Sequence, residues 1–140
     1  LFNMFLRADR YDAAKAARRM CKYFHHKLEL FGEECLVRDI TLQDLSPDDL
    51  EAMRIEGFEC KKCKDRAGRY LASCNLTRVS AKHWTNTARQ AWYRIITHLL
   101  EHEESQIYGM VDIYFCQFEA HDEERSWRFM ELIHGVGDII

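Results

Sequence analysis

The stretch Asp65-Arg66-Ala67-Gly68-Arg69 decides the fold, because it joins two predicted strands where a helical half of the chain gives way to a sheet. Gly68 can adopt a positive φ without a steric clash, and the Asp65 side chain can accept a hydrogen bond from the backbone two residues on. Strand-like residues stand on both sides of the stretch, over 58–60 and 70–74. This combination predicts a β-hairpin.

Two helices are predicted upstream of the hairpin. The first begins after Asp12, shows apolar residues at helical spacing and ends at Gly32, as a left-handed cap would end it. The second has Ser46 as a capping residue and Pro47 at the first helical position, and Gly57 is predicted to end it.

Downstream of the hairpin the pattern predicts a helix over 80–102, a strand over 107–116 and a helix over 122–134. The strand is almost continuously apolar, as strands covered on both faces are. Strand, crossover helix and strand form a βαβ unit. We therefore predict an α/β fold with an α+β-like layout, in which a helical subdomain over 1–55 precedes a mixed sheet flanked by helices over 56–140.

Composition excludes several classes of protein. The chain has 20 basic and 23 acidic residues, a net charge of −3, which argues against a nucleic-acid partner. It contains no run of about 18 apolar residues that would span a membrane. Six scattered cysteines favour reduced thiols in the cytoplasm over a secreted disulfide framework.

The N-terminal segment departs from this charge balance. Before Leu30 there are seven basic residues against three acidic ones. The segment either touches an anionic membrane surface or forms the solvated face of a helix.

The segment His98-Leu99-Leu100-Glu101-His102 matches the H-x-x-E-H zinc signature of inverzincin peptidases. Those enzymes take a third ligand from a helix far downstream, and only 38 residues follow here. In the alternative interpretation, His98 and His102 lie half-buried at the edge of an apolar stripe, each with a hydrogen-bond partner. A zinc peptidase acting through His98, Glu101 and His102 is thus kept as an alternative only.

A second possible set of zinc ligands is formed by Cys60, Cys63, Cys74 and His83. It lacks a second C-x-x-C, and residues three apart in a strand face opposite ways. The other interpretation is a strand end filled by small apolar side chains. We predict no metal, no cofactor and no catalytic residue, and therefore a protein that is not an enzyme.

The chain opens with Phe5-Leu6-Arg7-Ala8-Asp9-Arg10-Tyr11-Asp12-Ala13-Ala14-Lys15-Ala16, which resembles the N-terminal helical signature F-L-R-A-R-x-F-D-x-x-K-A of CRAL-TRIO proteins. That family continues with a D-x-x-G-R hairpin, matched by Asp65 to Arg69. A long helix follows, and then a buried strand of the form G-I-V-V-I-F-D, matched by residues 109–115. Order and spacing agree over nearly the whole chain.

The resemblance implies a lipid-binding or lipid-transfer module that does no chemistry. Its helical N-terminal subdomain would precede an α/β bowl, whose sheet floors a hydrophobic pocket closed by a mobile helix. The implied partners are a lipid such as phosphatidylinositol and, transiently, a membrane surface reached from the cytoplasm. In the family the closing helix lies beyond the position of Ile140, so we interpret the chain as truncated at its C-terminus. The alternative is a protein-interaction or regulatory module with a degenerate pocket.

The strand over 107–116 supplies the candidate ligand-binding residues, because its side chains alternate between two faces. The uniformly apolar set is expected to pack beneath the helix over 80–102: Val111, Ile113 and Phe115. A carboxylate under that helix would lose hydration without an obvious basic partner. The set that includes it is therefore predicted to line the lipid pocket: Met110, Asp112 and Tyr114.

Overall fold

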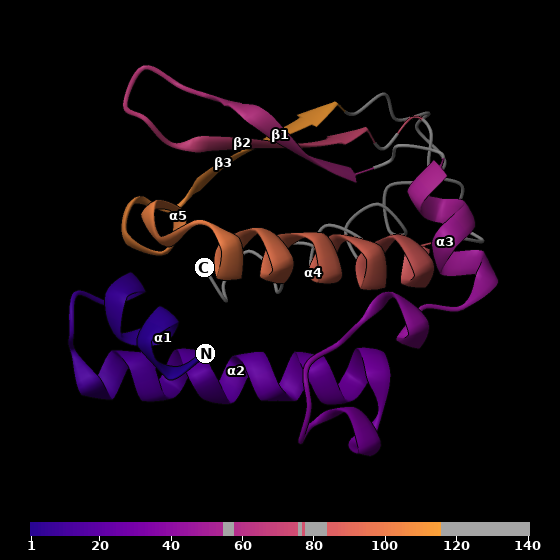
Figure 1. The fold of residues 1–140 in the computed structure, drawn as a ribbon, viewed down its shortest axis with the longest axis horizontal. Coiled ribbons are helices and arrows are strands. Elements are labelled where there is room, and N and C mark those ends of the chain that lie inside the picture. The colour runs from indigo at the N-terminus through magenta and orange to yellow at the C-terminus, as the bar shows by residue number, and fades with distance from the viewer. Residues whose placement is uncertain (55–57, 76, 78–83, 116–140) are drawn as a thin grey trace, which may run out of the picture.

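The computed structural model describes residues 1–54, 58–75, 77 and 84–115, and the predicted helix over 122–134 lies outside them. Within these residues the chain is an α+β protein with five α-helices and a three-stranded mixed sheet (Figure 1). The elements in chain order are α1 Phe2–Ala8, α2 Ala13–Phe31, η1 Glu33–Cys35, η2 Leu42–Asp44, α3 Pro47–Arg54, β1 Phe58–Lys64, β2 Tyr70–Asn75, α4 Trp84–Glu101, α5 Glu103–Tyr108 and β3 Met110–Phe115.

Local capping explains where the upstream helices begin and end. Asp12 caps α2, since its carboxylate accepts hydrogen bonds from the backbone N–H groups of Ala14 and Lys15 at 3.1 and 3.0 Å. Gly32 ends α2 with a φ of +83° and donates its N–H to the Leu28 carbonyl. These two predicted boundaries are confirmed.

The start of α3 is a reciprocal capping box. Asp49 donates its backbone N–H to the Ser46 hydroxyl at 3.2 Å, and the Ser46 N–H donates to the Asp49 carboxylate at 2.8 Å. Pro47 is the first helical residue, as predicted. The predicted end at Gly57 lies outside the described residues.

The hairpin joins β1 to β2 in antiparallel pairing, with Phe58 opposite Cys74. Asp65 accepts hydrogen bonds from the N–H groups of Ala67 and Arg69, both at 2.9 Å. Gly68 adopts a φ of +84°. The predicted turn chemistry is therefore confirmed.

A parallel pairing of β2 with β3 completes the predicted mixed sheet, in the order β1-β2-β3. The crossover differs from the prediction, because the residues before β3 form the short helix α5. Ile107 and Tyr108, predicted as strand, belong to this helix, which Gly109 ends with a φ of +73°. Two glutamates in its first turn favour the helix through its dipole.

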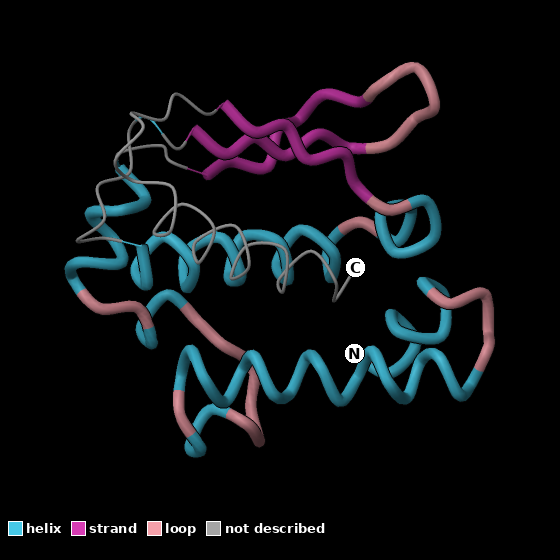
Figure 2. The backbone as a smooth tube through the Cα atoms, turned by 180° about the vertical axis from the view of Figure 1, so that it is seen from behind, coloured by secondary structure: helices cyan, strands magenta, loops and turns pink. Residues whose placement is uncertain are grey.

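The described elements form three layers, seen from the front in Figure 1 and from behind in Figure 2. The sheet lies on one side of α4, and α1 and α2 lie on the other. Trp92 of α4 packs on Tyr23 and Phe31 of α2, with ring centroids 5.3 and 5.2 Å apart. On the opposite side of α4, Gln90 donates to the Phe58 carbonyl of β1 at 2.8 Å. One core therefore extends from α1 and α2 through α4 to the sheet.

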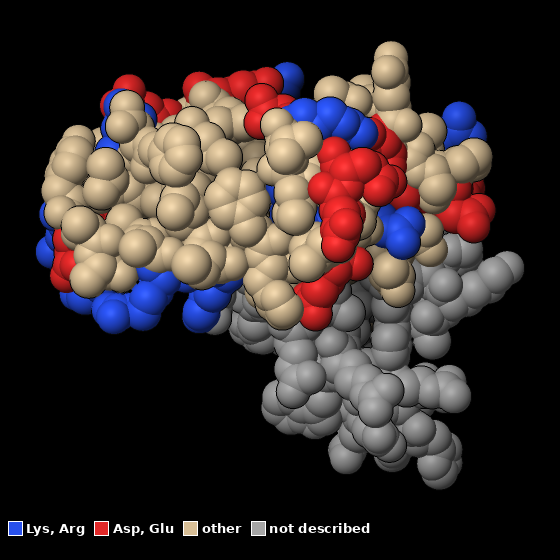
Figure 3. All heavy atoms as spheres, turned by 90° about the horizontal axis from the view of Figure 1, so that it is seen from below, with Lys and Arg blue, Asp and Glu red and all other residues tan. Residues whose placement is uncertain are grey.

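The outer side of α1 and α2 forms the face shown from below in Figure 3. None of the helices in the described ranges is long and apolar enough to cross a bilayer.

Candidate functional site

The two faces of the sheet differ in what covers them. Ala72 and Cys74 of β2 are fully buried in the core that includes α4. Their partners in the parallel ladder are Asp112 and Tyr114 of β3. Because paired residues share a face, this register places the set beginning at Met110 on the α4 side.

The predicted orientation of β3 is therefore wrong. Met110 and Tyr114 are partly buried and pack against the core, although they were predicted to face away from the helix. Ile113 and Phe115, predicted to lie beneath the helix, are 39% and 54% exposed. That Met110, Asp112 and Tyr114 contact a ligand stays an untested prediction.

Asp112 explains why the prediction failed. Its carboxylate shares the α4 side of the sheet yet remains exposed, so the expected loss of hydration does not arise. Arg94 of α4 also reaches this region, since both Arg94 and Asp112 act electrostatically on the Cys60 thiol. The helix thus places a basic side chain in the same region as Asp112.

The opposite face of β2 and β3 carries an apolar stripe, formed by Leu71, Val111, Ile113 and Phe115. Leu71 pairs directly with Val111, and Ile113 follows two residues along β3. The exposure of Ile113 and Phe115 means that β3 is not buried on both faces, contrary to the prediction. Exposed apolar side chains gathered in one place are typical of a surface that binds something.

A histidine cluster lies on the α4 side of the sheet. The rings of His98 and His102 are 4.4 Å apart, and Tyr70 lies 4.7 Å from each of them. His98 Nε2 is within hydrogen-bond distance of the Ser105 hydroxyl at 3.1 Å, and His102 Nδ1 lies 3.4 Å from the Tyr70 hydroxyl. The hydrogen-bonded alternative for these histidines is confirmed, with His102 partly buried and His98 more deeply buried than predicted.

The electrostatic environment of this cluster favours an uncharged His98, as expected for a side chain packed in the interior. Burial, together with the neighbouring His102, lowers the pKa of His98 below its ordinary value. Among the described residues no group of three or more histidine, cysteine, aspartate or glutamate side chains is placed to hold a metal ion. His83, one member of the second candidate set, lies outside the described residues.

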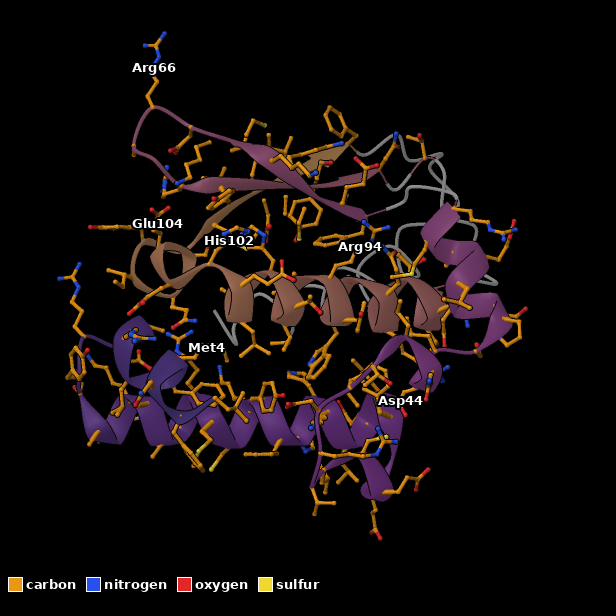
Figure 4. All side chains as sticks on the ribbon, in the orientation of Figure 1. Met4, Asp44, Arg66, Arg94, His102 and Glu104 are labelled. Atoms are coloured by element: carbon orange, nitrogen blue, oxygen red, sulfur yellow. The ribbon has the colours of Figure 1, made fainter. Side chains whose placement is uncertain are left out.

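Of the two cysteines of that set on β1, Cys60 is an unreactive thiol. Burial raises the pKa of the Cys60 thiol to about 12, so the nucleophilic thiolate is scarce at neutral pH. The thiol lies at a cavity of about 480 Å³ between the sheet and α4, which Arg94 and His102 also line (Figure 4). More of the cavity wall is apolar than polar, and hydroxyl and cationic groups interrupt it.

Sequence reasoning missed Leu71 as a candidate site residue. The signal was present in the alternation of β2, where the small residues Ala72 and Cys74 occupy one face. Small side chains let a helix approach a sheet closely, so they mark the face beneath α4. Leu71 must then lie on the other face, together with Val111.

Comparisons with known proteins attach no family to this geometry. Neither protein-family models, nor curated proteins, nor solved structures match the chain.

Proposed function

We propose that this protein is a lipid-binding module that holds a phospholipid or another hydrophobic ligand against the apolar stripe and does no chemistry on it. The observation that supports the proposal is the exposure of Ile113 and Phe115 on the sheet face opposite α4. Each methylene of a ligand that covers such surface contributes about 0.8 kcal/mol. The proposal moves the ligand from the predicted set Met110, Asp112 and Tyr114 to the other face.

The dimensions of the stripe suit an acyl chain. Six residues of β3 extend over about 20 Å at roughly 3.3 Å per residue. An acyl chain spans half of a hydrocarbon core of about 30 Å, and therefore about 15 Å. One extended chain can thus lie along β3, and the stripe side chains from Val111 to Phe115 cover about 13 Å of it at roughly 3.3 Å per residue.

The resemblance to CRAL-TRIO proteins points to the same ligand class, and we propose membership of that family. It also suggests that the protein is cytoplasmic and meets a membrane transiently when it takes up or releases its ligand. A helical layer, a hairpin and a βαβ unit in this order are compatible with that family.

Lipid extraction tests the proposal directly. Full-length protein purified from cells is extracted with organic solvent, and bound lipid is identified by mass spectrometry. About one lipid per protein is expected for wild type. The Ile113→Gln variant should carry several-fold less lipid. The control Leu100→Gln changes an aliphatic side chain of similar size and exposure on α4 and should retain the lipid.

A photoactivatable phospholipid then distinguishes the two faces of β3. Labelling at Ile113 or Phe115 is expected, with none at Met110 or Tyr114. The opposite labelling pattern would restore the original assignment. Protein without any co-purified lipid would contradict the proposal and favour the protein-interaction module.

A further inference from the structure

The cavity of about 480 Å³ between α4 and the hairpin strands β1 and β2 has the size of a small-molecule site. Pockets that bind small molecules have volumes of about 300–1,000 Å³. Arg94 and Glu101 line the cavity from α4, and Cys60, Lys62 and Tyr70 line it from the hairpin. The cavity therefore lies on the α4 side of the sheet, on the face opposite to the apolar stripe.

Arg94 brings a cationic group into this cavity that has no acceptor. The side chain is partly buried and lies between α4 and the sheet (Figure 4), and its Nε–H is shielded from solvent. It makes neither a hydrogen bond nor an ion pair with any residue over 1–54, 58–75, 77 or 84–115. Folded proteins nearly always supply an acceptor to a buried charged donor, because leaving the donor unsatisfied is costly. Arg94 is therefore placed to bind an anionic acceptor.

A second uncompensated cation lines the same cavity. Lys61 is paired with Glu59 along β1, so its charge is largely offset. Lys62 also lines the cavity, and it forms no ion pair within the part of the chain that the structure describes. Arg94 and Lys62 thus approach the cavity from α4 and from β1, where one anionic group can contact both.

Two carboxylates lie nearby, and both are exposed to solvent. Glu101 is the acidic side chain among the described lining residues. Asp112 is on the same side of the sheet but does not line the cavity. The charge of an exposed carboxylate is weakened at a distance by water and salt, whereas the Arg94 guanidinium is partly shielded from both. These carboxylates therefore reduce the attraction of the cavity for an anion without removing it.

The rest of the wall determines what else the ligand must carry. More of the wall is apolar than polar, and it includes the rings of Tyr70 and Tyr93. Aromatic side chains pack favourably on other rings. The planar fork of an arginine matches the two oxygens of a carboxylate and can donate to both. A molecule with a ring at one end and a carboxylate at the other satisfies both requirements.

We propose that this cavity binds a small aromatic carboxylate. Arg94 and Lys62 hold the carboxylate, and Tyr70 and Tyr93 contact the ring. The inference goes beyond the proposed lipid site and does not depend on it, because the two sites lie on opposite faces of the sheet.

Titration with 2-naphthoate tests the site by nuclear magnetic resonance. In full-length protein labelled with ¹⁵N-arginine, the Arg94 Nε–H signal is identified by its loss in Arg94→Lys. We expect this signal to shift saturably with 2-naphthoate and to move far less with 2-naphthamide, which has the same ring and no charge. An Arg94 signal that does not move with 2-naphthoate, or that moves equally with both compounds, would overturn the proposal.

Calorimetry on variants tests the role of each cation. We expect Arg94→Gln to weaken 2-naphthoate binding at least about tenfold, and Lys62→Gln about threefold because that lysine is exposed. Arg66→Gln makes the same change at the hairpin tip, where the side chain points away from the cavity (Figure 4), and should bind within about twofold of wild type. Circular dichroism verifies that the variants are folded.

The same measurements separate binding from packing. If Arg94 only packs against its neighbours, Arg94→Gln will weaken 2-naphthoate and 2-naphthamide by the same factor, which contradicts the proposal. A loss confined to 2-naphthoate supports it, and so does stronger 2-naphthoate binding in Glu101→Gln, which removes the carboxylate at the cavity.

The variant Ile113→Gln distinguishes this cavity from the apolar stripe. It is expected to lower the amount of co-purified lipid and to leave 2-naphthoate binding unchanged. Loss of 2-naphthoate binding in Ile113→Gln, with none in Arg94→Gln, would place the ring on the stripe and refute the cavity site. Lipid extraction from Arg94→Gln measures the other site, so either proposal can fail alone.

Discussion

Gly68 stabilises the hairpin through its backbone conformation alone. A Cβ added there would meet no atom within 4 Å, so space is not the constraint. The φ of +84° is the constraint, because side-chain-bearing residues disfavour the left-handed region.

We predict that Gly68→Ala lowers the free energy of unfolding by about 1 kcal/mol. Urea unfolding followed by circular dichroism measures the change. Ala67→Gly is the control in the same turn and should cost less than half as much. An unchanged unfolding midpoint for Gly68→Ala would refute the role given to the turn.

Tyr11 allows the effect of backbone strain on stability to be measured apart from side-chain packing. We predict that Tyr11→Gly raises the free energy of unfolding by up to about 1 kcal/mol, because glycine relieves the positive φ and the exposed ring buries little. Tyr11→Ala removes the same ring but keeps the strain, and should leave stability unchanged. Urea unfolding followed by circular dichroism measures both variants, and an unchanged unfolding midpoint for Tyr11→Gly would contradict the assigned strain.

The orientation of β3 could have been predicted from the sequence, but the prediction relied on the wrong residue. The prediction assumed that Asp112 would lose its hydration beneath the helix. Because β3 lies at the edge of the described sheet, the Asp112 carboxylate stays exposed to water and this loss does not occur. The side-chain sizes of β2 were the better guide, because close packing under α4 admits only small residues at Ala72 and Cys74. Packing volume constrains a sheet face more strongly than one carboxylate does.

Helix boundaries set by local chemistry were predictable, and those set by tertiary context were not. The starts of α2 and α3 follow from side chains that bond to backbone groups within three residues of themselves. Helix α5 was missed because Ile107 and Tyr108 are apolar and continue the pattern of β3. Their position instead follows from Gln106, which anchors α5 by donating to the Leu99 carbonyl.

A buried carboxylate at the start of α3 also links this helix to α4. Asp49 accepts hydrogen bonds from Asn86 of α4 at 2.7 Å and lies 3.3 Å from the Arg89 guanidinium. Burial raises the pKa of the Asp49 carboxyl, but the hydrogen bonds from Asn86 and Ser46 and the charge of Arg89 outweigh burial and lower it.

The lowered pKa of Asp49 determines how stability depends on pH. Its contribution is fully present above the unfolded-state pKa of about 3.9 and is lost as pH falls through the lower folded-state value. We predict that Asp49→Asn lowers the free energy of unfolding by about 2 kcal/mol at pH 7, and by less at pH 2 to 3. Asp48→Asn, in the same helix turn but exposed, is the control. A loss for Asp49→Asn that does not vary with pH would contradict the assigned charge.

The shared core makes the whole described part of the chain one packing unit. Trp92 is 1% exposed and contacts α2, while neighbouring residues of α4 contact the sheet. The predicted boundary between 1–55 and 56–140 is therefore a boundary in chain order that the core crosses. Hydrophobic periodicity predicted the long helices and the hairpin strands but could not show that α4 has two covered sides.

We predict that Trp92→Ala lowers the free energy of unfolding by about 3–5 kcal/mol and affects the helical layer and the sheet together. Trp92→Phe should cost less, because the phenyl ring refills much of the space. Urea unfolding monitored by far-ultraviolet circular dichroism and by thiol accessibility of Cys74 should give coincident transitions. Two separated transitions would show that residues 1–55 unfold independently.

The middle position of α4 has a consequence for biosynthesis. The ribosome completes α1 and α2 well before Trp92 emerges, at roughly 5–20 residues per second, so Tyr23 and Phe31 wait for seconds without their partner. During that interval the inner side of α2 is an apolar surface on a nascent chain. A chaperone that recognises aromatic segments would find its target there, and would be displaced once α4 docks.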